Sequence, residues 1–196
     1  MIKVILFDID GIIITGRKHL FSERLASEYN ISQELVEEFF RTDFRECTFG
    51  RADLKEKISP HLDKWNWGNG VEKLLEYWFT SENKTDKEVL DTVSRLRSRG
   101  IKCCIATRQE KYRSRYLLET LGLRKYFDGA FITCDIGYDK SQTEFWEYVL
   151  KKLEAKPEEI MFFDDTTKNI QFAESLGVKA IFYENINTLK KHTDSP

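Results

Sequence analysis

Two aspartates and a glycine end a short apolar run near the start of the chain, in the segment ILFDIDG at residues 5–11. Because side chains alternate along an extended strand, Asp8 and Asp10 point the same way and their charges lie close together. Like charges repel, and removing each one from water costs on the order of several kcal/mol. The segment therefore predicts either an exposed acidic pair or a site where a cation balances two carboxylates.

Further polar residues fall where other apolar runs end or amphipathic helices begin. They are Thr107, Lys140, Asp164 and Asp165. The carboxyl ends of parallel strands meet at one edge of a sheet, so these residues are expected near the first acidic pair. Each alone has a simpler explanation: an acidic pair arises by chance, Thr107 can be only a helix cap, and Lys140 can be a solvated surface lysine.

Taken together, these residue types suit the chemistry of phosphoryl groups. Clustered carboxylates bind a divalent cation, and an all-oxygen set favours Mg²⁺ over zinc. A hydroxyl at a helix start and a lysine both attract phosphate oxygens. A carboxylate beside the cation can attack phosphorus and form an aspartyl-phosphate, while a second carboxylate protonates the leaving oxygen and later activates water.

From residue 85 onward, short apolar runs alternate with amphipathic helices. Capping boxes predict helix starts at residues 85–88, 107–110 and 141–144. The predicted strands span residues 3–7, 101–106, 127–133, 160–163 and 179–183. This alternation predicts an α/β fold, a Rossmann-like three-layer α/β/α arrangement around a parallel sheet. The polar tail after Tyr183 is expected to be loosely packed.

Residues 17–84 differ from the rest and predict helices only, with candidates at 22–29, 33–44, 52–61 and 71–79. We expect a small all-helical cap at 17–84 on a core domain formed by residues 1–16 and 85–196. Aromatic clusters at 65–67 and 77–79 are expected in the core of the cap, with a partner or substrate surface as the alternative. Three arginines either meet an anionic substrate or lie on solvated helix faces: Arg41, Arg45 and Arg51.

Composition narrows the class of protein. Of the 196 residues, 33% are charged and 41% hydrophobic, which is typical of a soluble globular chain. Basic and acidic residues are interleaved with a net charge of −2, so neither nucleic acid nor an anionic membrane is an expected partner. No membrane span or signal peptide is expected. Four cysteines without CxxC spacing and three scattered histidines indicate no zinc site and favour a reduced, cytoplasmic setting.

The order of these motifs resembles the haloacid dehalogenase-like hydrolase superfamily, in the branch with a helical cap inserted after the first strand. The resemblance covers nearly the whole chain. The family pattern is a DxDG segment after an apolar strand, a threonine or serine ending a strand, a lysine before a helix, and two aspartates followed by a helix with an asparagine. The matching positions here are Asp8–Gly11, Thr107, Lys140 and Asp164–Asn169.

The resemblance implies a Mg²⁺-dependent phosphatase acting on a small phosphorylated metabolite. Asp8 would be the nucleophile and a metal ligand, and Asp10 the general acid/base and a metal ligand through its backbone carbonyl. Thr107 and Lys140 would hold the phosphoryl oxygens, and Arg108 is a further substrate-binding candidate. At the second acidic pair, Asp165 would bind the metal directly with Asp164 behind it, or the two would exchange places.

Three positions depart from the family pattern. Arg108 stands where many relatives carry asparagine, Ser141 where proline is common, and Ile12 where threonine is usual. These changes concern substrate fit and loop geometry more than the chemical step. Three alternatives stay open: a phosphomutase with the same motifs, a metal-independent haloacid dehalogenase, and a non-catalytic binding protein on this fold. Neither the substrate nor the oligomeric state follows from the sequence.

Overall fold

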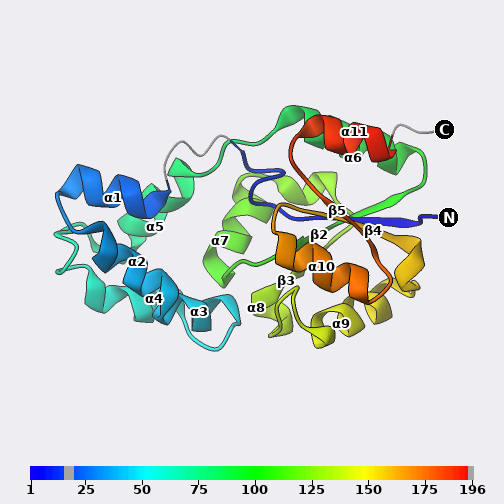
Figure 1. Ribbon diagram of the computed structural model, residues 1–196. Coiled ribbons are helices and arrows are strands. Elements are labelled where there is room, and N and C mark those ends of the chain that lie inside the picture. Colours follow the sequence, from blue (N-terminus) through cyan, green and yellow to red (C-terminus); the bar gives the residue numbers. More distant parts are fainter. Residues whose placement is uncertain (16–19, 194–196) are drawn as a thin grey trace.

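A five-stranded parallel sheet forms the centre of the larger part of the molecule (Figure 1). The computed structural model describes residues 1–15 and 20–193. The strands are β1 (Val4–Phe7), β2 (Lys102–Thr107), β3 (Gly129–Ile132), β4 (Ile160–Asp164) and β5 (Lys179–Phe182). They lie in the order β3-β2-β1-β4-β5, which places β1 in the middle. All carboxyl ends therefore meet at one edge, as the sequence pattern predicts.

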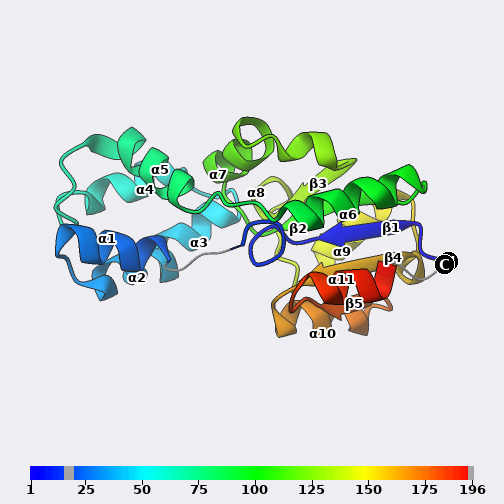
Figure 2. The same ribbon diagram turned by 90° about the horizontal axis from the view of Figure 1, so that it is seen from above.

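Helices cover both faces of the sheet (Figure 2). One face carries α6 (Lys87–Ser98), α11 (Ile186–Thr193) and the π-helical turn Tyr116–Thr120 that continues α7 (Lys111–Arg115). The other face carries α9 (Thr143–Leu153) and α10 (Thr167–Ser175). Within β1, Ile5 and Phe7 belong to one cluster and Val4 and Leu6 to the other, so the strand is buried on both sides. The predicted three-layer α/β/α fold is confirmed.

Helix α9 joins the hydrophobic core to the loop that precedes it. Trp146 is completely buried, and its ring lies edge-on to Phe162 at a centroid distance of 5.2 Å. Its indole Nε1 donates a hydrogen bond of 2.8 Å to the backbone carbonyl of Lys140. The packing of one tryptophan thus holds the backbone at Lys140, a predicted site residue, in a fixed place.

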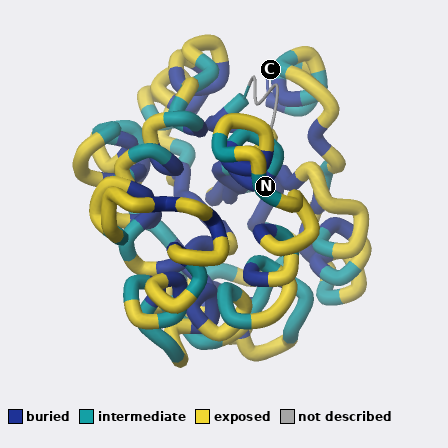
Figure 3. Tube along the Cα trace, turned by 90° about the vertical axis from the view of Figure 1, so that its left-hand side faces the viewer, coloured by how far each residue is buried: buried dark blue, intermediate teal, exposed yellow. Residues whose placement is uncertain are grey.

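Among the described residues between β1 and α6, five α-helices pack around a hydrophobic cluster of their own. They are α1 (Phe21–Tyr29), α2 (Gln33–Arg41), α3 (Asp43–Thr48), α4 (Leu54–Ile58) and α5 (Gly70–Ser81), which we call the helical insert. The insert lies beyond one edge of the sheet in Figure 1, and in Figure 3 the outward turns of the helices are the exposed ones. The aromatic clusters belong to its core, since Trp65 and Trp78 are buried. The limits of a separate cap stay predictions, and residues 16–19 at its first limit lie outside the described residues.

Several predicted helix limits are wrong. Helix α6 is capped by Asp86, whose carboxylate accepts from two backbone N–H groups, and not by Thr85. Thr107 still belongs to β2, and Glu110 caps α7 through the backbone N–H groups of residues 112 and 113. Because Glu110 is the cap and Thr107 Oγ1 has no hydrogen-bond partner among the described residues, the simple capping explanation for Thr107 is excluded. The predicted helices at 33–44 and 52–61 are each divided into two shorter pieces.

The expectation of a loosely packed tail is wrong for residues 186–193, which form α11. Leu189 is fully buried against the sheet, and Arg99 donates a hydrogen bond of 2.9 Å to the carbonyl of Thr193. Few apolar residues occur in this helix, so its periodicity was too weak to predict it. Within the described residues, all helices are too short or too polar to cross a membrane.

Replacing Trp146 with phenylalanine should lower the free energy of unfolding by about 2–3 kcal/mol, because a cavity forms and the carbonyl of Lys140 loses its donor. Thermal denaturation should show a melting temperature lower by roughly 5–10 °C. Tyr148→Phe on the exposed side of the same helix is the matched control, with an expected change below about 0.5 kcal/mol. Equal stability of Trp146→Phe and the wild type would contradict this account.

Candidate active site

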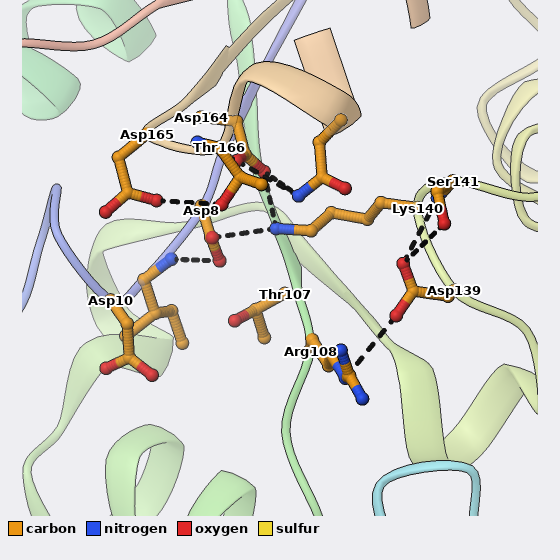
Figure 4. Close-up of polar contacts among 12 residues, drawn as sticks. Asp8, Asp10, Thr107, Arg108, Asp139, Lys140, Ser141, Asp164, Asp165 and Thr166 are labelled. Carbon is orange, nitrogen blue, oxygen red and sulfur yellow. Dashed lines mark hydrogen bonds and ion pairs between the residues drawn. The ribbon is translucent and has the colours of Figure 1, made fainter. Parts of the chain in front are cut away.

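A buried lysine lies between two aspartates at the carboxyl edge of the sheet (Figure 4). The ammonium of Lys140 is 2.7 Å from Asp8 Oδ2 and 2.6 Å from Asp164 Oδ2. Asp8 follows β1, and Asp164 ends the neighbouring strand β4, so adjacent parallel strands bring the two acids together. The structure thus unites three residues that are more than 20 positions apart in sequence.

Burial and neighbouring charges shift the ionisation of this group. Burial raises the pKa of Asp8 to about 6, against the opposing effect of the Lys140 ammonium. For Lys140, burial lowers the pKa, but the two carboxylates outweigh it and the net shift of its pKa is upward. Burial and the nearby Asp164 also raise the pKa of Asp165. The three carboxylates therefore share a site with one ammonium group, which leaves an excess of negative charge.

Asp8, Asp164 and Asp165 form a cluster of oxygen ligands. Each offers a carboxylate oxygen, and these oxygens lie within 4.8 Å of one another. Asp164 is already committed, because it also accepts hydrogen bonds from the Thr166 backbone N–H and from Asn169 Nδ2. Asp165 is exposed toward the cavity. This donor set and its excess negative charge fit a hard divalent cation such as Mg²⁺.

Gly11 allows the Asp165 carboxylate to approach the backbone. Its φ of +81° lies in the left-handed region, and a Cβ added at this position would lie 1.9 Å from Asp165 Oδ2. Any side chain at residue 11 would therefore displace a member of the acidic cluster. The glycine of the DxDG segment is required by this close contact.

Asp10 lies apart from the lysine and has different partners, which the sequence reasoning missed. Its Oδ2 accepts a hydrogen bond of 2.6 Å from Gln109 Nε2, and Arg113 Nη2 lies 3.3 Å from its Oδ1. Gln109 and Arg113 are both buried. Two features of the sequence could have indicated them. Both follow shortly after Thr107 at the same edge of the sheet, and they are four residues apart. Propensity alone does not distinguish them from ordinary helix residues.

Arg113 also connects Asp10 to the helical insert. Its Nη2 donates a 3.2 Å hydrogen bond to the carbonyl of Glu82 and lies 3.7 Å from the Glu82 carboxylate. Glu82 in turn accepts from the backbone N–H of Phe21 at 2.9 Å and from Trp78 Nε1 at 3.3 Å. One buried network therefore joins an acid of the sheet edge to the first and last helices of the insert.

The remaining predicted residues surround the same edge with different environments. Thr107 is buried, and its Oγ1 has no hydrogen-bond partner among the described residues. Arg108 is about half exposed, and its Nε lies 3.4 Å from Asp139 Oδ2. Asp139 also accepts hydrogen bonds from Ser141, so two departures from the family pattern meet at one carboxylate. Ile12 is fully buried in the core, which explains its apolar character.

A polar cavity of about 860 Å³ opens over the acidic cluster. Its wall includes Asp8, Asp10, Asp165, Lys140 and Arg108 but not Thr107. Arg45 and Arg51 of the insert also line it, and Arg41 does not. Arg41 is paired instead with two glutamates of its own helix, Glu34 and Glu37. Two of the three insert arginines thus reach the site.

Comparison with known proteins gives a consistent set of relatives. The chain is 24% identical over 184 residues to a phosphorylated carbohydrates phosphatase of Thermotoga maritima, covering 92% of this chain and 84% of that protein. It is 25% identical over 189 residues to the pyrophosphatase PpaX of Bacillus mycoides, covering 92% and 82%. The HAD family enzyme BT-2542 of Bacteroides thetaiotaomicron, solved with magnesium and inorganic phosphate, has the same fold. The TM-score is 0.79 and the identity 18%, and the match covers 94% of this chain and 95% of that chain.

The sequence model for the haloacid dehalogenase-like hydrolases matches residues 2–177. This range includes β1 with its two aspartates, the insert, and β4 with the second acidic pair. The resemblance found in the motifs is confirmed, and the chain is a member of the haloacid dehalogenase-like hydrolase family.

Proposed function

We propose that this hydrolase is a Mg²⁺-dependent phosphatase that cleaves a small phosphomonoester through an aspartyl-phosphate on Asp8. The observation that carries the proposal is the arrangement of Asp8 and Asp164 around the buried ammonium of Lys140, with Asp165 beside them. The phosphatase names of two relatives that align over most of the chain support it. The magnesium and phosphate present with BT-2542 agree with it.

In this proposal Asp8, Asp165 and the backbone carbonyl of Asp10 would hold the cation directly. Asp164 stands behind them, because its oxygens already bind Lys140, Thr166 and Asn169. When bound, the cation would neutralise charge on the phosphoryl group and on the attacking carboxylate. Lys140 and the unpaired hydroxyl of Thr107 would receive phosphoryl oxygens.

The protein's own side chains divide the reaction into two steps. A carboxylate oxygen of Asp8 attacks phosphorus, the bond from phosphorus to the alcohol oxygen breaks, and Asp10 gives a proton to the departing alcohol. Water then attacks the phosphorus of the aspartyl-phosphate and gives a proton to Asp10, which regenerates the Asp8 carboxylate and releases phosphate. Gln109 and Arg113 hold the Asp10 carboxylate in place during both steps.

The alternatives are less consistent with this site. A dehalogenase needs no metal, and its chemistry has no use for the acid at Asp10 or for the second acidic pair. A non-catalytic binding protein has no need of a buried nucleophile held beside a lysine. A phosphomutase shares every residue of the site and differs in its product, an isomerised sugar phosphate in place of free phosphate.

Asp8→Asn should lower phosphate release by a factor of roughly 10³ or more, because the amide cannot replace the nucleophile. The variant should still fold, since Lys140 keeps its pairing with Asp164. Phosphate release from a monoester panel with Mg²⁺ and circular dichroism would measure the two properties. Asp91→Asn, an exposed position on α6, is the control. An active Asp8→Asn protein would exclude the proposed intermediate.

Mg²⁺ at about 100 times its Kd should stabilise the protein by about 2.7 kcal/mol, or roughly 5–10 °C in melting temperature. The pKa of Asp8 is raised to about 6 in the metal-free protein, so protons compete with the cation below that pH. The Mg²⁺-induced shift should therefore be constant above about pH 7 and decline as the pH falls through 6. Asp165→Asn should remove most of the shift at pH 7.5. A full shift in that variant would show that the cation binds elsewhere.

Gln109→Leu should reduce turnover of a poor alcohol leaving group roughly 10–100-fold, because the donor that holds the general acid is lost. Turnover of p-nitrophenyl phosphate should fall much less, since nitrophenolate leaves without a proton. Comparing kcat for benzyl phosphate and p-nitrophenyl phosphate measures this difference. Gln171→Leu, exposed on α10, is the control. An equal loss with both substrates would mean that Gln109 supports the structure and not proton transfer.

A further inference from the structure

A second cavity, of about 450 Å³, lies between the helical insert and the sheet edge. Asp10 and Arg108 line both this cavity and the polar one, so the two spaces meet at the proposed general acid. Its volume is within the range of small-molecule sites. Unlike the polar cavity, it has a mostly apolar wall.

The apolar wall consists of aromatic rings from four helices of the insert. Phe21, Phe40, Phe44 and Trp78 come from α1, α2, α3 and α5. The Trp78 ring is 5.0 Å from Phe21, 5.2 Å from Phe40 and 5.4 Å from Phe44, measured between centroids. These contacts hold the rings in place, so the wall is preformed and would bind an apolar group with little rearrangement.

The buried polar groups of this cavity are largely satisfied by one another. Glu82 accepts from Phe21 and Trp78, and Gln109 donates to Asp10. Among the described residues the buried exception is Arg113 Nη1, which has no hydrogen-bond partner. The cavity therefore offers a bound molecule a mostly apolar surface, to which Ser22, Glu37, Arg41 and Arg108 add polar groups.

From this geometry we propose that the second cavity receives the leaving group of the substrate, and that it selects a phosphomonoester of an apolar, ring-bearing alcohol over a sugar phosphate. The inference rests on the proposed function. The phosphoryl group would lie in the polar cavity at Asp8, and the alcohol would extend past Asp10 into the aromatic wall. Arg113 Nη1 would donate a hydrogen bond to an acceptor atom of that alcohol.

The physical reason is the cost of burying hydroxyl groups without partners. A hexose would place several hydroxyls against the rings of Phe40, Phe44 and Trp78, which form the apolar part of a wall whose polar members include Ser22, Glu37 and Arg41. A benzene ring would replace water over the same surface and gain from its burial. The preference for an apolar alcohol therefore follows from the apolar wall. It differs from the phosphorylated carbohydrates named for the Thermotoga relative.

The test compares kcat/KM for benzyl phosphate and glucose 6-phosphate, both monoesters of primary alcohols, on the whole protein with Mg²⁺. Benzyl phosphate should be preferred by roughly 10–100-fold. Acetyl phosphate, whose leaving group is small, tests the proposed function independently of the second cavity. Pyrophosphate is added because its leaving group is anionic and Arg45 and Arg51 line the polar cavity.

Phe44→Gln should lower the ratio of kcat/KM for benzyl phosphate to that for acetyl phosphate by about tenfold, because it places a polar group in the wall. Ser22→Leu, which fills the cavity from α1, should lower the same ratio and serves where Phe44→Gln folds poorly. Leu35→Gln, partly exposed on α2 and outside the cavity, should leave the ratio unchanged.

The outcomes separate the two proposals. Hydrolysis of acetyl phosphate together with a preference for glucose 6-phosphate or pyrophosphate would overturn the inference and leave the phosphatase function standing. Failure to release phosphate from any of the four substrates would overturn the proposed function itself. A benzyl preference that both cavity variants leave unchanged would place the apolar subsite elsewhere.

Discussion

The site depends on one buried ammonium group held between two carboxylates. Lys140 contacts Asp8 and Asp164 at ion-pair distance, while Asp165 is close enough to share a ligand with them. Three ionised carboxylates and one ammonium leave a charge of −2 in this cluster, which the lysine alone does not balance. Burial, followed by the nearby charge of Asp164, raises the pKa of Asp8 against the opposing effect of Lys140. A divalent cation would offset this charge, so the electrostatics of the cluster agree with the proposed chemistry.

The rest of the fold holds the Lys140 ammonium in a buried position, away from water. The middle strand β1 supplies Asp8, and β4 supplies Asp164 directly beside it. The Asp164 carboxylate is fixed by Asn169 of α10, and the backbone of Lys140 by Trp146 of α9. Both helices cover the same face of the sheet. The position of the ammonium therefore follows from core packing, and a disturbance of that core reaches the site through named hydrogen bonds.

The sequence predicted the parts of the site that depend on local order. Asp8, Lys140 and Asp164 follow from the rule that strand ends meet at one edge, and the family motifs agree with it. Gln109 and Arg113 were missed, because only the folded arrangement turns them toward Asp10. The first and last residues of the helices were mispredicted for the same reason. Tertiary contacts and side-chain caps such as Glu110 outweigh the local sequence pattern there. Which rings of the insert line a cavity, and which fill its core, depends on packing between helices that no periodicity encodes.

Asp10 is the point where the two halves of the molecule meet. On one side lies the charged cavity of the sheet edge, and on the other the aromatic wall of the insert. Arg113 contacts both Asp10 and Glu82, and Glu82 holds the start of α1 and the indole of Trp78. In the proposed mechanism, the group that gives its proton to the leaving alcohol is thus bound to the same network that positions the surface which the alcohol would contact. In such an arrangement, a leaving group that fits the aromatic wall also lies in the geometry that proton transfer needs. The same contacts then determine both how the alcohol binds and how it departs.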